Sequence, residues 1–124
     1  FLKHAKSLEK KKPVIWMGDI NATVADIDLA RPKENAGKLG CTEDERTRLA
    51  KFCEAFIDTF RYKNGNEVKY SWWDMKTRAR DRNIGWRIDY VFVSKVLENK
   101  ISRADILTEV YGSDHCPVIL EVKI

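Results

Sequence analysis

The sequence predicts an α/β fold in which helices cover one face of a mixed sheet. Two observations lead to this prediction. Apolar residues recur at helical spacing in two segments, one at the start of the chain and one that begins near residue 42. Short runs of β-branched and aromatic residues, separated by turn-forming residues, make up most of the remainder. Helices followed by several strands are typical of a layered α/β structure.

The first elements are a helix, a strand and a long loop. Apolar residues three apart over residues 1–8 predict the helix, and the apolar run 14–17 has the length and composition of a buried strand. Residues 18–41 are rich in Asp, Asn, Pro and Gly. They predict a loop that contains one short helical turn at 26–30.

A second helix is predicted to begin at a capping box. Thr42 and Glu45 have the spacing at which the N-cap hydroxyl and the N3 carboxylate each bind the other's backbone amide. Leu49, Phe52 and Phe56 follow at helical spacing. This pattern predicts an amphipathic helix.

The rest of the chain is predicted to be mainly strands. Short strands are expected at 57–60 and 70–73, around a turn at 64–66. A longer strand is expected at 87–94, after a charged loop at 76–82. The remaining elements are a short helix at 95–99 and strands at 105–110 and 118–123.

Composition limits the class of protein. The 124 residues are enough for one domain or part of one. The 23 Lys and Arg against 19 Asp and Glu give a net charge of +4, which is compatible with nucleic acid as a partner. Three cysteines without a Cys-x-x-Cys spacing indicate a reducing intracellular compartment, cytoplasmic or, in a eukaryote, nuclear. No apolar stretch suits a signal peptide or a membrane span, so no membrane partner is expected.

Polar residues lie at the ends of several predicted strands. Asp19 and Asn21 follow the first strand, Asp89 lies within the longest one, and Asp114 and His115 precede the last. Each has an ordinary interpretation. Asp and Asn after a strand can simply shape a turn, and an Asp-His pair can cap a loop. An acidic residue inside an apolar strand must face solvent or be paired.

Together these residues suit the hydrolysis of a phosphodiester. That reaction needs a hard cation, a group that activates water, and donors to the developing charge. Asp114 offers the oxygen ligand that Mg²⁺ prefers. Asp19 is suited to activate water, and Asn21 to position that water or the phosphate. His115, oriented by Asp89, can donate a hydrogen bond to the phosphate.

Three motifs resemble those of the exonuclease III family of apurinic/apyrimidinic endonucleases, within the endonuclease/exonuclease/phosphatase superfamily. They occur in the family's order: Gly18–Ala22 (GDINA), Asn83–Tyr90 (NIGWRIDY) and Gly112–Pro117 (GSDHCP). Each motif alone is weak evidence, but the ordered set is specific. The matching region runs from about residue 13 to the end and corresponds to the carboxyl-terminal half of a family member.

The resemblance implies a fold and a function. Residues 1–124 would form one incomplete half of a four-layer α/β/β/α sandwich, with one mostly antiparallel mixed sheet flanked by helices. Its uncovered sheet face would pair with the missing amino-terminal half or with a second copy. The implied enzyme is a Mg²⁺-dependent DNA-repair phosphodiesterase, with Mn²⁺ as the alternative metal. It would act on duplex DNA at abasic or 3′-damaged sites, cutting 5′ to the abasic site and trimming 3′ ends.

The resemblance also assigns roles to residues. Asp19, Asn21, Asp89 and His115 would be catalytic, and Asp114 would lie at the metal. Trp72, Trp86 and Ile88 would form an apolar pocket for a flipped-out abasic sugar, while Asn83, Arg80 and Asn35 would contact the DNA. The ordinary interpretation of the aromatic residues is core packing, and Trp73 is expected there. One departure is clear: the family's Gln-Glu metal motif is absent, because the chain contains no glutamine.

Two other functions remain open. The first is a superfamily phosphodiesterase that acts on phospholipid head groups or nucleotides, although Trp72, Trp86 and the basic loop argue against it. The second is a catalytically silent fragment that binds DNA or assembles with a partner. The missing Glu ligand favours this second alternative for the chain by itself.

Overall fold

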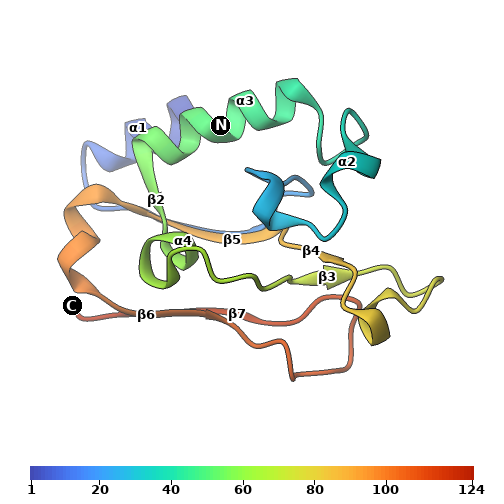
Figure 1. Ribbon diagram of the computed structural model, residues 1–124. Helices are drawn as coiled ribbons and strands as arrows, with labels where there is room; N and C mark the ends of the chain where they lie inside the picture. The colour runs from blue at the N-terminus through green and yellow to red at the C-terminus, as the bar shows by residue number, and fades with distance from the viewer.

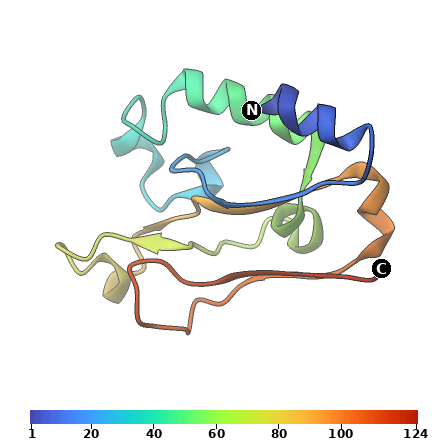
Figure 2. The same cartoon turned by 180° about the vertical axis from the view of Figure 1, so that it is seen from behind.

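The computed structural model describes all 124 residues and has the predicted α/β fold. Two helices lie together over one face of a three-stranded sheet, and a two-stranded sheet lies on the other side (Figure 1). The view from behind shows the same layers (Figure 2). The helices are α1 (Leu2–Glu9) and α3 (Glu43–Ala55), the central strands are β1 (Ile15–Asp19), β5 (Asp89–Ser94) and β2 (Phe56–Asp58), and the outer strands are β6 (Ile101–Ile106) and β7 (Val118–Val122).

The strands form three small sheets in place of one mixed sheet. β5 is the centre of the first sheet, with β1 on one side and β2 on the other. β3 (Trp72–Trp73) pairs with β4 (Gly85–Trp86), and β6 pairs with β7. Every pairing is antiparallel. The fold class is therefore confirmed, but no strand pair is parallel.

One apolar core lies between the helices and the central sheet. Phe52 of α3 packs with Phe56, Tyr90 and Phe92 from β2 and β5, and Ala5 of α1 closes the cluster. Burying a phenylalanine side chain contributes about 1.5–3 kcal/mol. The predicted capping box is present at the start of α3 and fixes where this helix begins.

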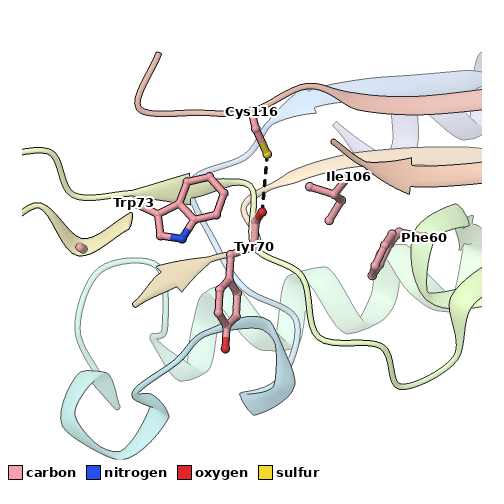
Figure 3. Close-up of a cluster of buried hydrophobic side chains, with 6 residues drawn as sticks. Phe60, Tyr70, Trp73, Ile106 and Cys116 are labelled. Atoms are coloured by element: carbon pink, nitrogen blue, oxygen red, sulfur yellow. Dashed lines mark hydrogen bonds between the residues drawn. The ribbon is translucent and has the colours of Figure 1, made fainter. Parts of the chain in front are cut away.

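A second core lies on the other side of the central sheet, beneath β3. Figure 3 shows Phe60, Tyr70, Trp73, Ile106 and Cys116 gathered there, and the cluster also includes Ala79. The thiol of Cys116 donates a hydrogen bond to the carbonyl oxygen of Tyr70 at 3.6 Å. This core joins β3 to the segment that precedes β7.

The strand predicted at 57–60 is only partly correct, and the turn predicted at 64–66 is present at Gly65 and Asn66 but follows a helix. β2 ends at Asp58, and α4 (Thr59–Asn64) follows at once. The carboxylate of Asp58 accepts from the amide of Arg61 as an N-cap, and Gly65 follows the helix with a positive φ of 60°. Both are ordinary helix start and stop signals, so the sequence contained the evidence for this helix.

The strand predicted at 105–110 is displaced. The observed strand is β6, which ends at Ile106. Beyond it the amide of Thr108 donates to the carbonyl of Ile106, and the amide of Val110 donates to that of Leu107. These bonds turn the chain away from β7.

Short helices occupy several connections. The turn predicted at 26–30 is the 3₁₀ helix η1 (Asp26–Asp28), and the helix predicted at 95–99 is the 3₁₀ helix η3 (Lys95–Lys100). Two more were not predicted, α2 (Pro32–Asn35) and η2 (Ala79–Arg82). None of the helices combines the length and the hydropathy that a membrane span requires.

Candidate active site

Two carboxylates and one imidazole meet at one end of the central sheet. Nδ1 of His115 lies 2.9 Å from Oδ2 of Asp89, and its Nε2 lies 3.9 Å from Oδ2 of Asp19. Because a carboxylate can only accept, Nδ1 of His115 donates to Asp89. The structure therefore brings together three of the four residues predicted to be catalytic.

Strand pairing places the two carboxylates side by side. Asp19 is the last residue of β1, Asp89 is the first of β5, and the two are direct partners in the antiparallel register. Directly opposed residues in such a pair project to the same face of the sheet. Asp89 is largely buried and Asp19 is partly exposed, with 14% and 36% of their side chains accessible.

Ser71 and its neighbours hold His115 against this strand pair. The side-chain hydroxyl of Ser71 accepts hydrogen bonds from the backbone amides of Ile88 and Asp89. The backbone carbonyl of Ser71 accepts one from the amide of Cys116. A bridge between Trp72 and His115 continues this pairing. The fully buried Ser71 thus connects the backbone of Asp89 to that of Cys116, the residue after His115, and its role was missed in the sequence.

Asn21 completes a tight turn at the end of β1. Its amide donates to Oδ1 of Asp19 at 2.8 Å, and its φ is 52°. Asparagine tolerates this left-handed conformation better than most residues do. The ordinary interpretation, that Asp19 and Asn21 shape a turn, is therefore correct, and it is compatible with a further role for both side chains.

A pocket of about 670 Å³ opens beside His115. Trp72 and Trp86 contribute to its wall and are direct partners of β3 and β4, with ring centroids 6.4 Å apart and an edge-on angle of 83°. The lining residues are Asn21, Leu39, Gly40, Glu45, Trp72, Trp86, Ile88, Asp114 and His115. Six of these were predicted site residues. Trp73, by contrast, is buried in the core, as expected.

The part of the wall next to Trp86 comes from the loop after α2. A Cβ on Gly40 would lie 2.7 Å from Cζ3 of Trp86, so only glycine lets this backbone lie against the indole. Glu45, the acidic member of the capping box, accepts from the amide of Gly40 at 2.8 Å. Leu39, which is exposed at the rim, was not predicted as a site residue, and neither were Gly40 and Glu45.

Asp114 also lines the pocket and lies outside the three-residue cluster. Its Oδ2 accepts from the indole N–H of Trp72 at 3.1 Å, and Ser113 donates to Oδ1 at 3.3 Å. The hydrogen bond from Trp72 lowers the pKa of Asp114 below its ordinary value. The carboxylate is therefore held ionised in an accessible position.

The remaining predicted residues lie away from the pocket. The side-chain amide of Asn35 donates to the carbonyl of Arg31, and that of Asn83 accepts from the indole of Trp73 at 3.0 Å. Arg80 donates to two backbone carbonyls, those of Thr108 and Val110. Each side chain thus has a structural partner, and contacts of all three with DNA stay a prediction.

A buried ion-pair network lies two residues from Asp89. Arg87 is 1% exposed, its Nε donates to Asp28 at 2.7 Å, and its two Nη atoms donate to both oxygens of Asp58 at 2.9 and 2.7 Å. Arg61 donates to the same oxygen of Asp28 at 2.8 Å. The network joins η1, β2 and the segment between β4 and β5. It was not predicted, because an arginine inside a motif gives no sign of its partners.

The three motifs are thus assembled around one His-Asp pair, and the family of the chain follows from comparison with known proteins. A family model described as the endonuclease/exonuclease/phosphatase family matches residues 2–115. The chain belongs to this family. The match covers nearly all of the sequence, and the resemblance seen in the motifs is confirmed.

Similar proteins within the endonuclease/exonuclease/phosphatase family include nucleases. An exodeoxyribonuclease from Bacillus subtilis is 47% identical over 99% of this chain, and a DNA-(apurinic or apyrimidinic site) endonuclease from Dictyostelium discoideum is 40% identical over 95%. The solved structure of an AP endonuclease from Archaeoglobus fulgidus covers 99% of the chain at 25% identity, with a TM-score of 0.84. This chain spans 50%, 34% and 52% of the lengths of these three proteins.

The oxygen ligands available here fit part of a divalent cation site. Asp19, Asp89 and His115 have ligand atoms within 4.8 Å of one another, but Asp89 and Nδ1 of His115 are already paired. Asp114 has an accessible carboxylate with the low pKa that a metal ligand needs. Mg²⁺ commonly takes one or two carboxylates and several waters. Asp114 therefore fits as one ligand.

Proposed function

We propose that this chain supplies half of the active site of a DNA-repair phosphodiesterase, which hydrolyses the bond 5′ to an abasic site and trims 3′ ends. The observation that carries the proposal is the cluster of Asp19, Asp89 and His115 beside a pocket walled by Trp72 and Trp86. The nuclease names of the relatives at 47% and 40% identity support it. Because the chain spans only part of their length, the activity belongs to the assembled protein.

In this proposal His115 binds the scissile phosphate. Asp89 accepts from Nδ1 and so fixes the orientation of the ring, which leaves Nε2 directed at the side where Asp19 lies. When protonated, Nε2 donates to a phosphate oxygen, and the neighbouring carboxylates stabilise the imidazolium. Asp89 thus acts as a positioning residue for His115.

Asp19 is proposed to accept a proton from the attacking water. Its carboxylate is partly exposed beside Nε2 of His115, so a water that attacks a phosphate bound by His115 would lie within its reach. The amide of Asn21 donates to Oδ1 of Asp19 and leaves Oδ2 on the side of the imidazole. The Asn21 side chain lines the pocket and is placed to contact the water or the phosphate.

Asp114 would hold a magnesium ion, which would supply neutralisation of phosphate oxygens and stabilisation of the leaving oxygen. The hydrogen bond from Trp72 keeps Asp114 ionised and limits its rotation. Mn²⁺ would use the same oxygen ligand.

The aromatic pocket supports an abasic sugar as substrate over a lipid head group. Trp72, Trp86 and Ile88 present apolar surface to a cavity that Asn21, Glu45, Asp114 and His115 also line. Such a pocket accepts a deoxyribose without a base and disfavours a charged head group. The nearby loop 76–82 carries four cations, Lys76, Arg78, Arg80 and Arg82, against one carboxylate, which favours a polyanion.

The site is proposed to be completed by the complementary half of the protein or by a second copy. Ile15 and Met17 lie on the same face of the edge strand β1 as Asp19 and are about half exposed. Exposed apolar side chains next to a site are typical of an interface. If no partner supplies the remaining metal ligands, the chain would bind DNA without cutting it.

The test is cleavage of a duplex oligonucleotide that contains one abasic site, in the presence and absence of Mg²⁺. Cleavage should require the metal and fall at least about 100-fold in His115→Ala, since a general acid or phosphate donor contributes about 10²–10⁴. Asp89→Asn should lose activity as well. His4→Ala is the matched control, because His4 is the other histidine and is exposed on α1.

The outcomes separate the alternatives. Metal-dependent cleavage that both site variants lose supports a site assembled by the chain itself, as a self-associated pair. Duplex binding without cleavage supports a half that needs its complement. Neither binding nor cleavage of the abasic duplex, with hydrolysis of a phospholipid head group or a nucleotide, would contradict the proposal.

A further inference from the structure

We infer that Tyr111 forms a stacking subsite for a nucleobase next to the reacting phosphate. This inference rests on the proposed function and adds a residue that lies outside the three motifs. Tyr111 comes just before the Gly112–Pro117 motif and is 75% exposed.

The ring of Tyr111 is held in place on one face only. The guanidinium of Arg80 lies 3.8 Å from its centroid, and the same guanidinium lies 4.4 Å from the ring of Trp73. Trp73 belongs to the buried core, so the stack of Trp73, Arg80 and Tyr111 runs from the interior to the surface. One flat face of the tyrosine is covered, and the other faces solvent.

Arg80 is itself fixed, which makes the stack rigid. Its Nη2 donates to the carbonyl of Thr108 at 2.7 Å and to that of Val110 at 2.8 Å. Those two residues form the turn that leads to Tyr111, so one guanidinium orients both the ring and its backbone. A ring that is already ordered loses little conformational freedom when a base stacks on it.

The subsite adjoins the candidate catalytic pocket. Tyr111 lines a hollow of about 580 Å³ together with Met75, Arg78, Ser113 and Asp114. Asp114 also lines the pocket of Trp72 and Trp86, so the two spaces share this residue as a wall. A nucleotide chain with its phosphate at Asp114 and His115 would therefore place a neighbouring base near Tyr111.

The chemistry of the hollow favours a base over an apolar side chain. Tyr111 and Met75 supply exposed surfaces that suit a flat aromatic ring, and Arg78 lines the hollow in an ion pair with Asp81 at 3.0 Å. Aromatic side chains bind bases without regard to sequence, because every base has a π face. The subsite would thus hold the base that flanks the lesion and leave the choice of lesion to the tryptophan pocket.

The test uses a duplex with a tetrahydrofuran abasic analogue and 2-aminopurine as the flanking nucleotide, in buffer without divalent metal. Tyr111→Ala should weaken binding of this duplex about ten-fold, which matches the loss of one base stack. It should also abolish the change in 2-aminopurine fluorescence on binding. Tyr111→Phe keeps the ring and should bind within two-fold of the unmodified chain. Tyr62→Ala, which removes an exposed tyrosine on α4, is the control.

Each result decides the inference. Unchanged binding by Tyr111→Ala, while the unmodified chain binds well, overturns the subsite and leaves the proposed function standing. Equal losses in Tyr111→Phe and Tyr111→Ala would show that the hydroxyl matters and the ring does not, which also overturns it. If the unmodified chain binds no duplex, with or without the abasic analogue, both the proposed function and the subsite fail.

Discussion

Replacing Arg87 by Met should destabilise the chain by about 3–5 kcal/mol, because it leaves buried carboxylates without their cation. Arg87 makes one hydrogen bond to Asp28 and two to Asp58. Asp28 keeps its bond from Arg61, so most of the cost falls on Asp58, whose side chain is 9% exposed. We therefore expect a loss near the lower end of the range.

Urea unfolding at pH 7, followed by far-ultraviolet circular dichroism, measures this loss directly. Arg48→Met is the matched control, since Arg48 pairs with Asp44 on the surface of α3 and is 78% exposed. Surface ion pairs contribute about 0–1 kcal/mol, so the control should be nearly neutral. Adding Asp58→Asn to Arg87→Met should restore part of the stability, because it removes the unpaired charge. A loss below about 1 kcal/mol in Arg87→Met would refute the interpretation of this network as a buried support.

Two further predictions concern the wall of the pocket and the dependence of stability on pH. Gly40→Ala should cost about 1–3 kcal/mol and alter the near-ultraviolet signal of Trp86, because the new methyl would overlap the indole. Gly65→Ala is the control, because no atom lies within 4 Å of the new methyl group and only the strain of the positive φ remains. Equal spectral changes in both variants would contradict this reasoning. Burial raises the pKa of Cys53 to about 11. The pKa of Cys53 is higher in the folded chain than in the unfolded chain. Its contribution to the free energy of unfolding should therefore be fully present below about pH 8.5 and decline toward pH 11, by up to about 1.4 kcal/mol per pH unit. Cys53→Ala should flatten this decline in urea titrations, and an unchanged slope would show that other groups, such as Cys116, account for it.

Much of the fold followed from local patterns. The capping box of Thr42 and Glu45 predicted where α3 begins, and the apolar run before Gly18 predicted β1. These predictions succeeded because the signals act over a few residues along the chain. The errors at α4 and β6 arose where a short segment suited both a strand and a helix or turn, and there the partners in space decided the outcome.

For the candidate site too, local patterns indicated some residues, and only the tertiary structure revealed others. The motifs predicted Asp19, Asp89, His115 and Trp86 as candidate site residues, and the structure places them at one end of the central sheet and at the adjoining pocket. No local pattern indicated that Ser71 binds the backbone of Asp89 and Cys116, or that Gly40 packs against an indole.

What the sequence by itself determined is therefore the family, the α/β class and a set of candidate site residues that the structure brings together. Only the tertiary structure decided that Asp19 and Asp89 lie in register, that Asp114 separates from their cluster toward Trp72, and that Arg80 serves as a support for Tyr111. The physical reason is sequence separation. Each of these arrangements joins residues about 30 to 70 positions apart. Such long-range contacts depend on the packing of the whole core, which local sequence patterns do not determine.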